Sequence, residues 1–76
     1  KYSVLRGEKM VKFTVFTSDG IRIYATKKYK TLNDYYLDLS LVADGKTKCI
    51  LFQDIYGVLV SISPINCVIE AKEIEE

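Results

Sequence analysis

The residues of this chain best suited to bind another molecule are basic and aromatic side chains that alternate within residues 12–30. Aromatic rings stack on nucleobases and cations neutralise phosphates, which is the combination that single-stranded nucleic acid requires. The candidate binding residues are Lys12, Arg22, Tyr24, Lys27, Lys28, Tyr29 and Lys30. The same residues suit an acidic protein partner, or they form a charged strand edge that blocks aggregation. The sequence leaves these three interpretations open, and it contains no recognised RNA-binding motif.

Charge is unevenly distributed along the chain, although its sum is small. The net charge is +1, from eleven Lys and Arg against ten Asp and Glu. Residues 1–30 hold eight of the basic residues and two of the acidic ones, whereas residues 31–76 hold three and eight. Counterion release from phosphates needs a strong basic footprint, so the near-neutral total favours a protein partner over nucleic acid.

Residues that would carry catalysis or bind a metal are sparse. The chain has no histidine, which excludes His-based acid–base catalysis, Ser-His and Cys-His nucleophiles and the common zinc sites. Asp34, Asp38 and Asp54 show no spacing typical of a paired-carboxylate site, and the four glycines are isolated rather than gathered in a phosphate-binding loop. We therefore predict that the chain is not an enzyme and uses neither a cofactor nor a metal.

The cysteines and the hydropathy pattern predict a protein of the cytoplasm. Cys49 and Cys67 are too few for a disulfide scaffold and neither belongs to a CxxC motif. We interpret both as small buried thiols, with one bridge between them as the alternative. No apolar run approaches the roughly 18 residues of a membrane span, and no signal peptide is visible. We therefore expect no contact with a membrane.

Period-2 alternation of apolar and polar residues predicts strands nearly throughout, and these strands must position the candidate side chains. The first predicted hairpin pairs residues 10–17 with 21–27 around a three-residue loop that ends in Gly20. Such a loop sets Val15 opposite Ile23, which keeps the apolar sides of the two strands together. The polar face then pairs Lys12 with Thr26, Thr14 with Tyr24 and Phe16 with Arg22.

A second hairpin is predicted around Asp44-Gly45, a dipeptide typical of type I′ turns. Three leucines alternate with polar residues in the run 34–43, as they would in a strand with one buried face. A two-residue turn places Leu39 opposite Ile50 in the returning strand, 46–53. The far face of this hairpin carries Tyr36, Val42 and Leu51, and an apolar face of this kind needs a cover. We therefore predict a homo-oligomer with these three residues at its interface.

The rest of the chain predicts two short strands, 58–62 and 67–71, within a single domain that spans 1–76. Residues 1–9 are expected as a leader or a first edge strand, and residues 72–76 as an acidic tail. Five or six mostly antiparallel strands in so short a chain predict an all-β fold, as a partly closed barrel or a pair of packed curved sheets. The turn at Ser63-Pro64-Ile65-Asn66 before the last strand resembles the close of an SH3-like barrel, and this resemblance implies a small SH3-like barrel, with a two-sheet roll as the alternative. The peptide-binding motifs of SH3 domains are absent, so the resemblance concerns the fold alone.

These observations favour a non-catalytic interaction module or regulatory subunit that acts through protein–protein contacts. The alternative is a nucleic-acid-binding barrel that uses the basic and aromatic face of the first hairpin.

Overall fold

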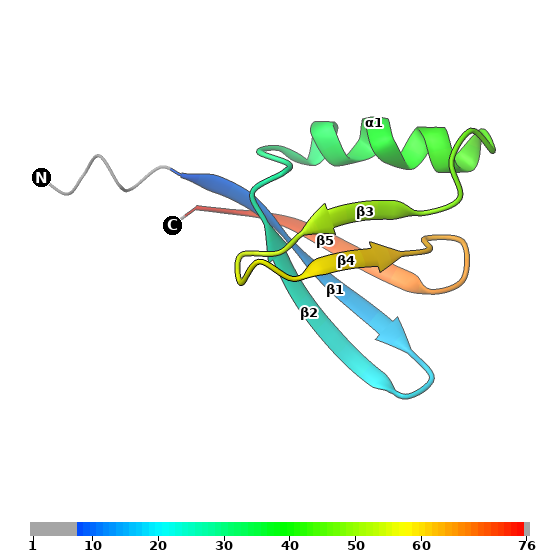
Figure 1. The fold of residues 1–76 in the computed structure, drawn as a ribbon, viewed down its shortest axis with the longest axis horizontal. Coiled ribbons are helices and arrows are strands. Elements are labelled where there is room, and N and C mark those ends of the chain that lie inside the picture. The colour runs from blue at the N-terminus through cyan, green and yellow to red at the C-terminus, as the bar shows by residue number, and fades with distance from the viewer. Residues whose placement is uncertain (1–7, 76) are drawn as a thin grey trace, which may run out of the picture.

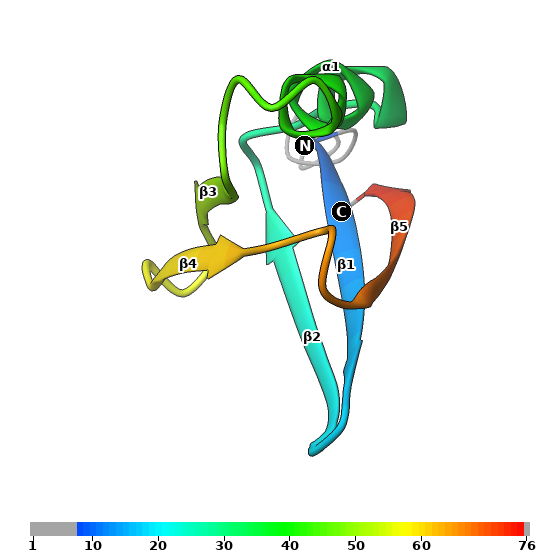
Figure 2. The same cartoon turned by 90° about the vertical axis from the view of Figure 1, so that its right-hand side faces the viewer.

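Five strands and one helix make up residues 8–75, the part of the chain that the computed structural model describes (Figure 1). The elements are β1 (Lys9–Thr17), β2 (Gly20–Thr26), α1 (Leu32–Ala43), β3 (Ile50–Gln53), β4 (Leu59–Ile62) and β5 (Val68–Glu75). The strands form two antiparallel sheets, with the orders β2-β1-β5 and β3-β4. The two-stranded sheet lies beside the three-stranded one, and α1 runs alongside β3 on the side away from β4 (Figures 1 and 2). The prediction of a mostly antiparallel β fold is confirmed, but the strands of residues 8–75 do not close into a barrel.

The run 34–43, predicted as a strand, is helical, so the prediction of a second hairpin is wrong. Thr31 and Asp34 form a capping box, in which the Thr31 hydroxyl accepts from the Asp34 N–H at 3.2 Å and the Asp34 carboxylate accepts from the Thr31 N–H at 3.3 Å. No β-branched residue occurs from 32 to 41, and leucine is a strong helix former. At the other end Gly45, with a φ of 77°, ends the helix, and its N–H donates to the Val42 carbonyl. Asp44-Gly45 is therefore a helix terminus and not a hairpin turn.

The first hairpin exists, but its register differs from the prediction. Its loop is Ser18-Asp19, and Thr17 pairs with Gly20, so that Phe13 lies opposite Tyr24. The Thr17 hydroxyl donates to the Gly20 carbonyl at 3.0 Å and accepts from the Asp19 N–H, which stabilises this tighter turn. The prediction assumed that the apolar residues of both strands share one face, whereas this register separates them.

The core lies between the inner face of the three-stranded sheet, β3–β4 and α1. Its centre is an aromatic cluster around Phe13, whose ring centroid is 5.1 Å from that of Phe52 and 4.7 Å from that of Tyr35. The buried residues of the core cluster are Val11, Phe13, Val15, Tyr29, Tyr35, Val42, Ile50, Phe52, Val60 and Ile62. Alternate residues of β3 and β4 are buried, as expected for strands that cover one side of a core.

The last strand extends further than the sequence predicts. Residues 72–75, expected as an acidic tail, continue β5 along β1, where Lys72 pairs with Lys12 and Glu75 with Lys9. Lys9 is already part of β1, so the expected leader or edge strand, 1–9, reaches into β1 at its end. Residues 1–7 of that prediction lie outside the described part of the chain.

Candidate functional site

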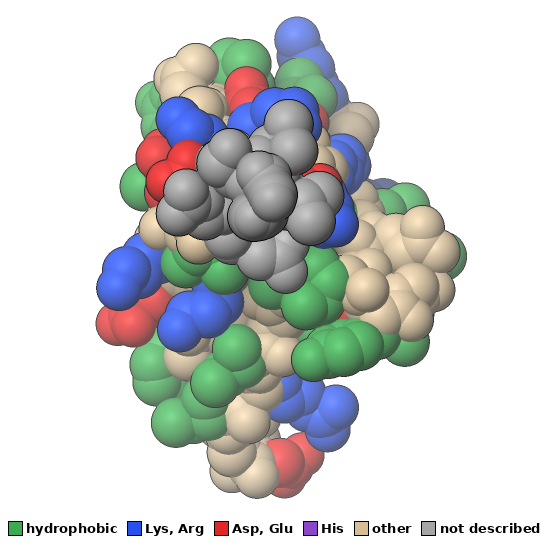
Figure 3. Space-filling model, turned by 90° about the vertical axis from the view of Figure 1, so that its left-hand side faces the viewer, with side chains coloured by type: hydrophobic (Ala, Val, Ile, Leu, Met, Phe, Trp, Pro, Cys, Tyr) green, Lys and Arg blue, Asp and Glu red, His purple; other side chains and the backbone are tan. Residues whose placement is uncertain are grey.

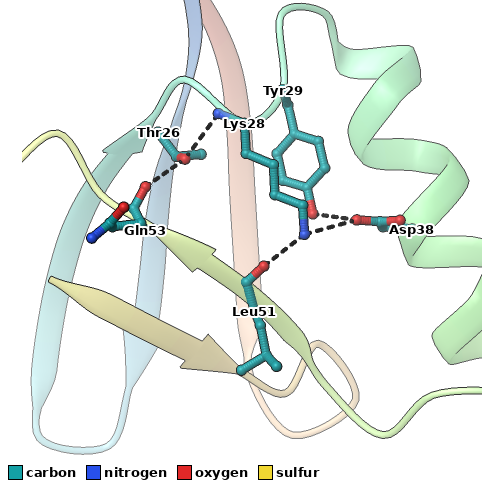
Figure 4. A network of polar contacts seen from close by, with 6 residues as sticks. All are labelled: Thr26, Lys28, Tyr29, Asp38, Leu51 and Gln53. Carbon is teal, nitrogen blue, oxygen red and sulfur yellow. Dashed lines mark hydrogen bonds and ion pairs between the residues drawn. The ribbon is translucent and has the colours of Figure 1, made fainter. Parts of the chain in front are cut away.

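Lys28 and Tyr29, two of the predicted binding residues, belong to an internal polar network (Figure 4). Tyr29 is 2% exposed, and its hydroxyl donates to the Asp38 carboxylate on α1 at 2.6 Å. The Lys28 Nζ lies 3.4 Å from the same carboxylate oxygen and donates to the Leu51 carbonyl of β3 at 2.7 Å. These contacts tie the segment after β2 to the helix and to β3.

Burial raises the pKa of the Tyr29 hydroxyl well above its ordinary value, and the hydrogen bond to Asp38 and the carboxylate's charge raise it further. Burial also raises the pKa of Tyr35, whose ring centroid is 5.7 Å from that of Tyr29. Both phenols therefore stay neutral at physiological pH. The buried Tyr29 ring presents no face on which a base could stack.

The same network occupies the edge of β3 that is not paired with β4. The Thr26 hydroxyl donates to the Gln53 carbonyl at 2.8 Å and accepts from the Lys28 N–H, and Thr26 is fully buried. In the turn between β3 and β4, the Ile55 N–H donates to the Ala25 carbonyl of β2 at 2.9 Å. Side chains and a single backbone bond thus hold β2 beside β3, where a continuous ladder would have closed a barrel.

The other predicted binding residues do not gather on one surface. The predicted pairing of Lys12 with Thr26 is wrong: Lys12 lies opposite Ala25, on the face away from Arg22 and Tyr24. Lys27 forms an ion pair with Glu8 at 3.2 Å. Lys30 is exposed beside the start of α1, where its N–H donates to the Asp34 carboxylate. The basic and aromatic face predicted from the sequence is therefore divided between two sides of the sheet and an internal network.

The predicted oligomer interface is also divided. Val42 is 3% exposed and belongs to the core cluster, so it adds no surface to this face. Leu51 is 50% exposed and lines a shallow depression with Leu41. Tyr36 is 62% exposed. It precedes Leu41 by five residues, so its side chain lies about 140° from that of Leu41 around the helix axis, away from the depression.

A different apolar surface exists on the side of the three-stranded sheet that turns away from the core. The register places Ile21, Phe16 and Val68 side by side across the three strands, with Ile23 next along β2. Ile21, Ile23 and Val68 are each more than 60% exposed. The register predicted from the sequence turned the isoleucines of β2 toward the core, so this row was not expected.

The turn between β3 and β4 extends this surface. Ile55 and Tyr56, 44% and 84% exposed, line one depression together with Ile23 and Ala25. We call the whole surface the outer apolar face, and it consists of Phe16, Ile21, Ile23, Ile55, Tyr56 and Val68. Figure 3 shows hydrophobic side chains on the lower half of this side of the molecule, with basic and acidic side chains beside and below them as well as above.

A groove lies on the opposite side of β2, between the β1–β2 hairpin and the end of β4. Its volume is about 480 Å³. Its polar lining residues are Thr17, Ser18, Arg22, Tyr24, Ser61, Ser63 and Asn66. No acidic side chain lines the groove, and Arg22 takes part in no ion pair within residues 8–75. We call this feature the Arg22 groove.

Neither a metal-binding cluster nor a disulfide occurs in the described residues. Within residues 8–75, no three His, Cys, Asp or Glu side chains lie close enough together to hold a metal ion. Cys49 and Cys67 are both half-buried free thiols, so the alternative of a bridge between them is not realised. In the same residues, no helix has the length and apolar character needed to cross a membrane.

Comparison with known proteins adds no functional assignment. No protein family, curated protein or solved structure matches this chain. Its functional residues must therefore be inferred from the geometry and chemistry of its own surface.

Proposed function

We propose that this chain is a non-catalytic interaction module that holds a protein partner against its outer apolar face. The observation that carries the proposal is the continuous apolar row across β2, β1 and β5, extended by the turn between β3 and β4. Large apolar patches on small proteins are typical of protein-interaction sites, because leaving them in water is unfavourable.

The composition of the surface around the face also supports a protein partner. Lys12, Lys72 and Glu70 follow the apolar residues on the same side of the sheet, so an apolar centre is bordered by charges of both signs. An apolar centre with a polar rim is the usual anatomy of a protein–protein interface. A surface for nucleic acid would instead need a concentrated basic footprint.

We also propose that the fold is an incomplete SH3-like barrel. The succession β5-β1-β2 followed by β3-β4 supports this description, because residues 25–28 contact β3 and the turn that follows it. Side-chain hydrogen bonds take the place of the missing ladder between the two sheets.

The proposed function is tested by site-specific photo-crosslinking in cells that naturally express the chain. A photoreactive phenylalanine analogue replaces Ile21, Ile23 or Val68 in separate variants. Leu37 is the matched control position, because it is an apolar residue 57% exposed on α1, at the far end of the molecule from the hairpin. We expect all three outer positions to crosslink one common protein and the control position to leave it unlabelled.

Two results would contradict the proposal. Equal labelling from Leu37 would mean that the outer apolar face is not the contact surface. Binding of single-stranded oligonucleotides at about 50 mM salt that falls steeply by about 200 mM and is lost on Tyr24→Ala would replace it with a nucleic-acid function.

A further inference from the structure

We infer that the free edge of β2 binds an extended peptide whose residues alternate between apolar and acidic. This inference rests on the proposed function and adds the chemistry of the partner. It combines three observations: an unpaired strand edge, the outer apolar face on one side of it, and the Arg22 groove on the other.

The first observation is the direction of the β2 backbone. Successive residues of a strand turn their N–H and C=O groups to opposite edges. The Ala25 carbonyl accepts from Ile55, outside the three-stranded sheet, so the backbone groups of Ile21 and Ile23 point to the same outer edge. Within residues 8–75, neither Ile21 nor Ile23 has a hydrogen-bond partner on that edge. Each offers one N–H and one C=O to an added strand.

The two sides of this edge determine what the added strand should carry. Alternate side chains of a strand lie on opposite faces of its sheet. Every second residue of the peptide would lie beside Ile21 and Ile23 on the outer apolar face, and the residues between would enter the Arg22 groove. An apolar residue suits the first environment, since burial there removes both partners from water.

An acidic residue suits the second environment. Arg22 is exposed, has no ion pair within residues 8–75 and lies in a groove with no acidic lining residue. A guanidinium group binds a carboxylate through two parallel hydrogen bonds, and this arrangement is stronger than a neutral pair. The hydroxyls of Ser61 and Ser63 and the Asn66 amide line the same groove and add further donors.

A second copy of the chain is a poorer occupant of this edge. Antiparallel pairing of two β2 edges about Arg22 would set two guanidinium groups directly opposite each other, which is unfavourable. Pairing about Ile23 would bring Ile21 against Ala25 of the other copy, where Ile55 already lies. The free part of the edge is residues 20–24, and a peptide of about five residues would cover it at roughly 3.4 Å per residue.

The inference is tested with the fluorescent peptide Ser-Val-Glu-Val-Glu-Val-Ser and the full chain. Fluorescence anisotropy gives the affinity, and amide NMR spectra locate the site. We expect the amide signals of Ile21 and Ile23 to shift, while those of α1 do not. Peptides with Gln or Lys in place of Glu should bind at least about tenfold more weakly, because the carboxylate contact is lost.

Matched variants separate charge from strand pairing. Arg22→Glu should weaken binding by about tenfold or more, whereas Lys46→Glu makes the same charge change on the exposed loop after α1 and should leave the affinity unchanged. A peptide with N-methyl groups on alternate amides keeps its side chains but loses its backbone donors. The N-methylated peptide should not bind, and this comparison requires no change to the protein.

Several outcomes would overturn the inference. Equal binding of the Glu and Lys peptides would remove the role of Arg22, and binding of the N-methylated peptide would exclude strand pairing. Shifts of Ile21 and Ile23 that grow with the concentration of the chain alone would assign the edge to a second copy. If the peptide does not bind but Ile23 still crosslinks the partner, the inference is wrong and the proposed function stands. If the peptide does not bind and the crosslink is also absent, both the inference and the proposed function are wrong.

Discussion

The Asp38 carboxylate contacts both the phenol of Tyr29 and the ammonium of Lys28, so these two candidate binding residues are already engaged within the chain, Tyr29 in the core and Lys28 at its exposed margin. The phenol is buried and needs an acceptor, since a buried polar group without a partner destabilises the fold. The Lys28–Asp38 pair is partly exposed and contributes at most about 1 kcal/mol by itself. Tyr29 is therefore the energetically important member of the network.

Tyr29→Phe should lower the free energy of unfolding by about 1–2 kcal/mol. The variant keeps the buried ring but removes a hydrogen bond to a charged acceptor, which is typically worth about 1.5–3 kcal/mol, and the partial exposure of Asp38 reduces that figure. Urea unfolding at neutral pH measures the change. Tyr36→Phe, on the exposed side of α1, is the control and should stay within about 0.5 kcal/mol.

Alkaline pH should destabilise the fold through Tyr29 and Tyr35. Burial raises the pKa of both phenols in the folded chain, whereas in the unfolded chain they deprotonate near pH 10. Their contribution to stability is complete below about pH 10 and falls as the pH rises further, because the unfolded state loses its protons first. Urea unfolding across this range should show the decrease, and Tyr29→Phe should reduce its slope. If the ultraviolet spectrum shows all tyrosines ionising together near pH 10, this account is wrong.

At the scale of the elements, the sequence pattern predicted a strand at each of β1 to β5 but could not identify α1. Leucines at every second position between 34 and 43 match a strand, yet the core uses only one side of a helix there, through Tyr35, Leu39 and Val42. The signals that decide are local: a capping box at Thr31 and a terminating Gly45. Both could have been recognised in the sequence, whereas the register of the first hairpin depends on side-chain bonds within its turn.

Thr31→Ala should therefore destabilise the fold by about 1 kcal/mol. The variant removes the hydroxyl that caps the Asp34 N–H, and loss of such a cap typically costs about 0.5–2 kcal/mol. The Glu73 carboxylate still accepts from the Leu32 N–H at 2.8 Å, so β5 continues to hold the start of the helix. Urea unfolding followed by circular dichroism gives the change. Thr47→Ala, in the exposed loop after α1, should leave stability unaltered.

At the scale of the whole molecule, a small core coexists with many exposed apolar side chains. Eleven apolar residues are buried, while thirteen large apolar side chains stay exposed within residues 8–75. A chain this short buries a smaller fraction of its surface than a larger domain does, so some exposure is expected. What the sequence could not predict is where the exposed residues gather, because the outer apolar face depends on the register of β2 against β1 and on the position of the β3–β4 turn.

Replacing Ile21 and Ile23 together with threonine separates binding from folding. Threonine is β-branched and suits a strand, and both isoleucines are more than 60% exposed, so the free energy of unfolding should change by less than about 0.5 kcal/mol for each site. Phe13→Ala, at the centre of the core, should instead cost about 3–5 kcal/mol. Thermal unfolding measures both, and crosslinking from Val68 measures the interaction. Partner labelling should disappear in the double threonine variant while its melting temperature stays near that of the parent chain. A large fall in melting temperature would mean that these isoleucines support the fold itself, and the outer apolar face would then lose its interpretation as a contact surface.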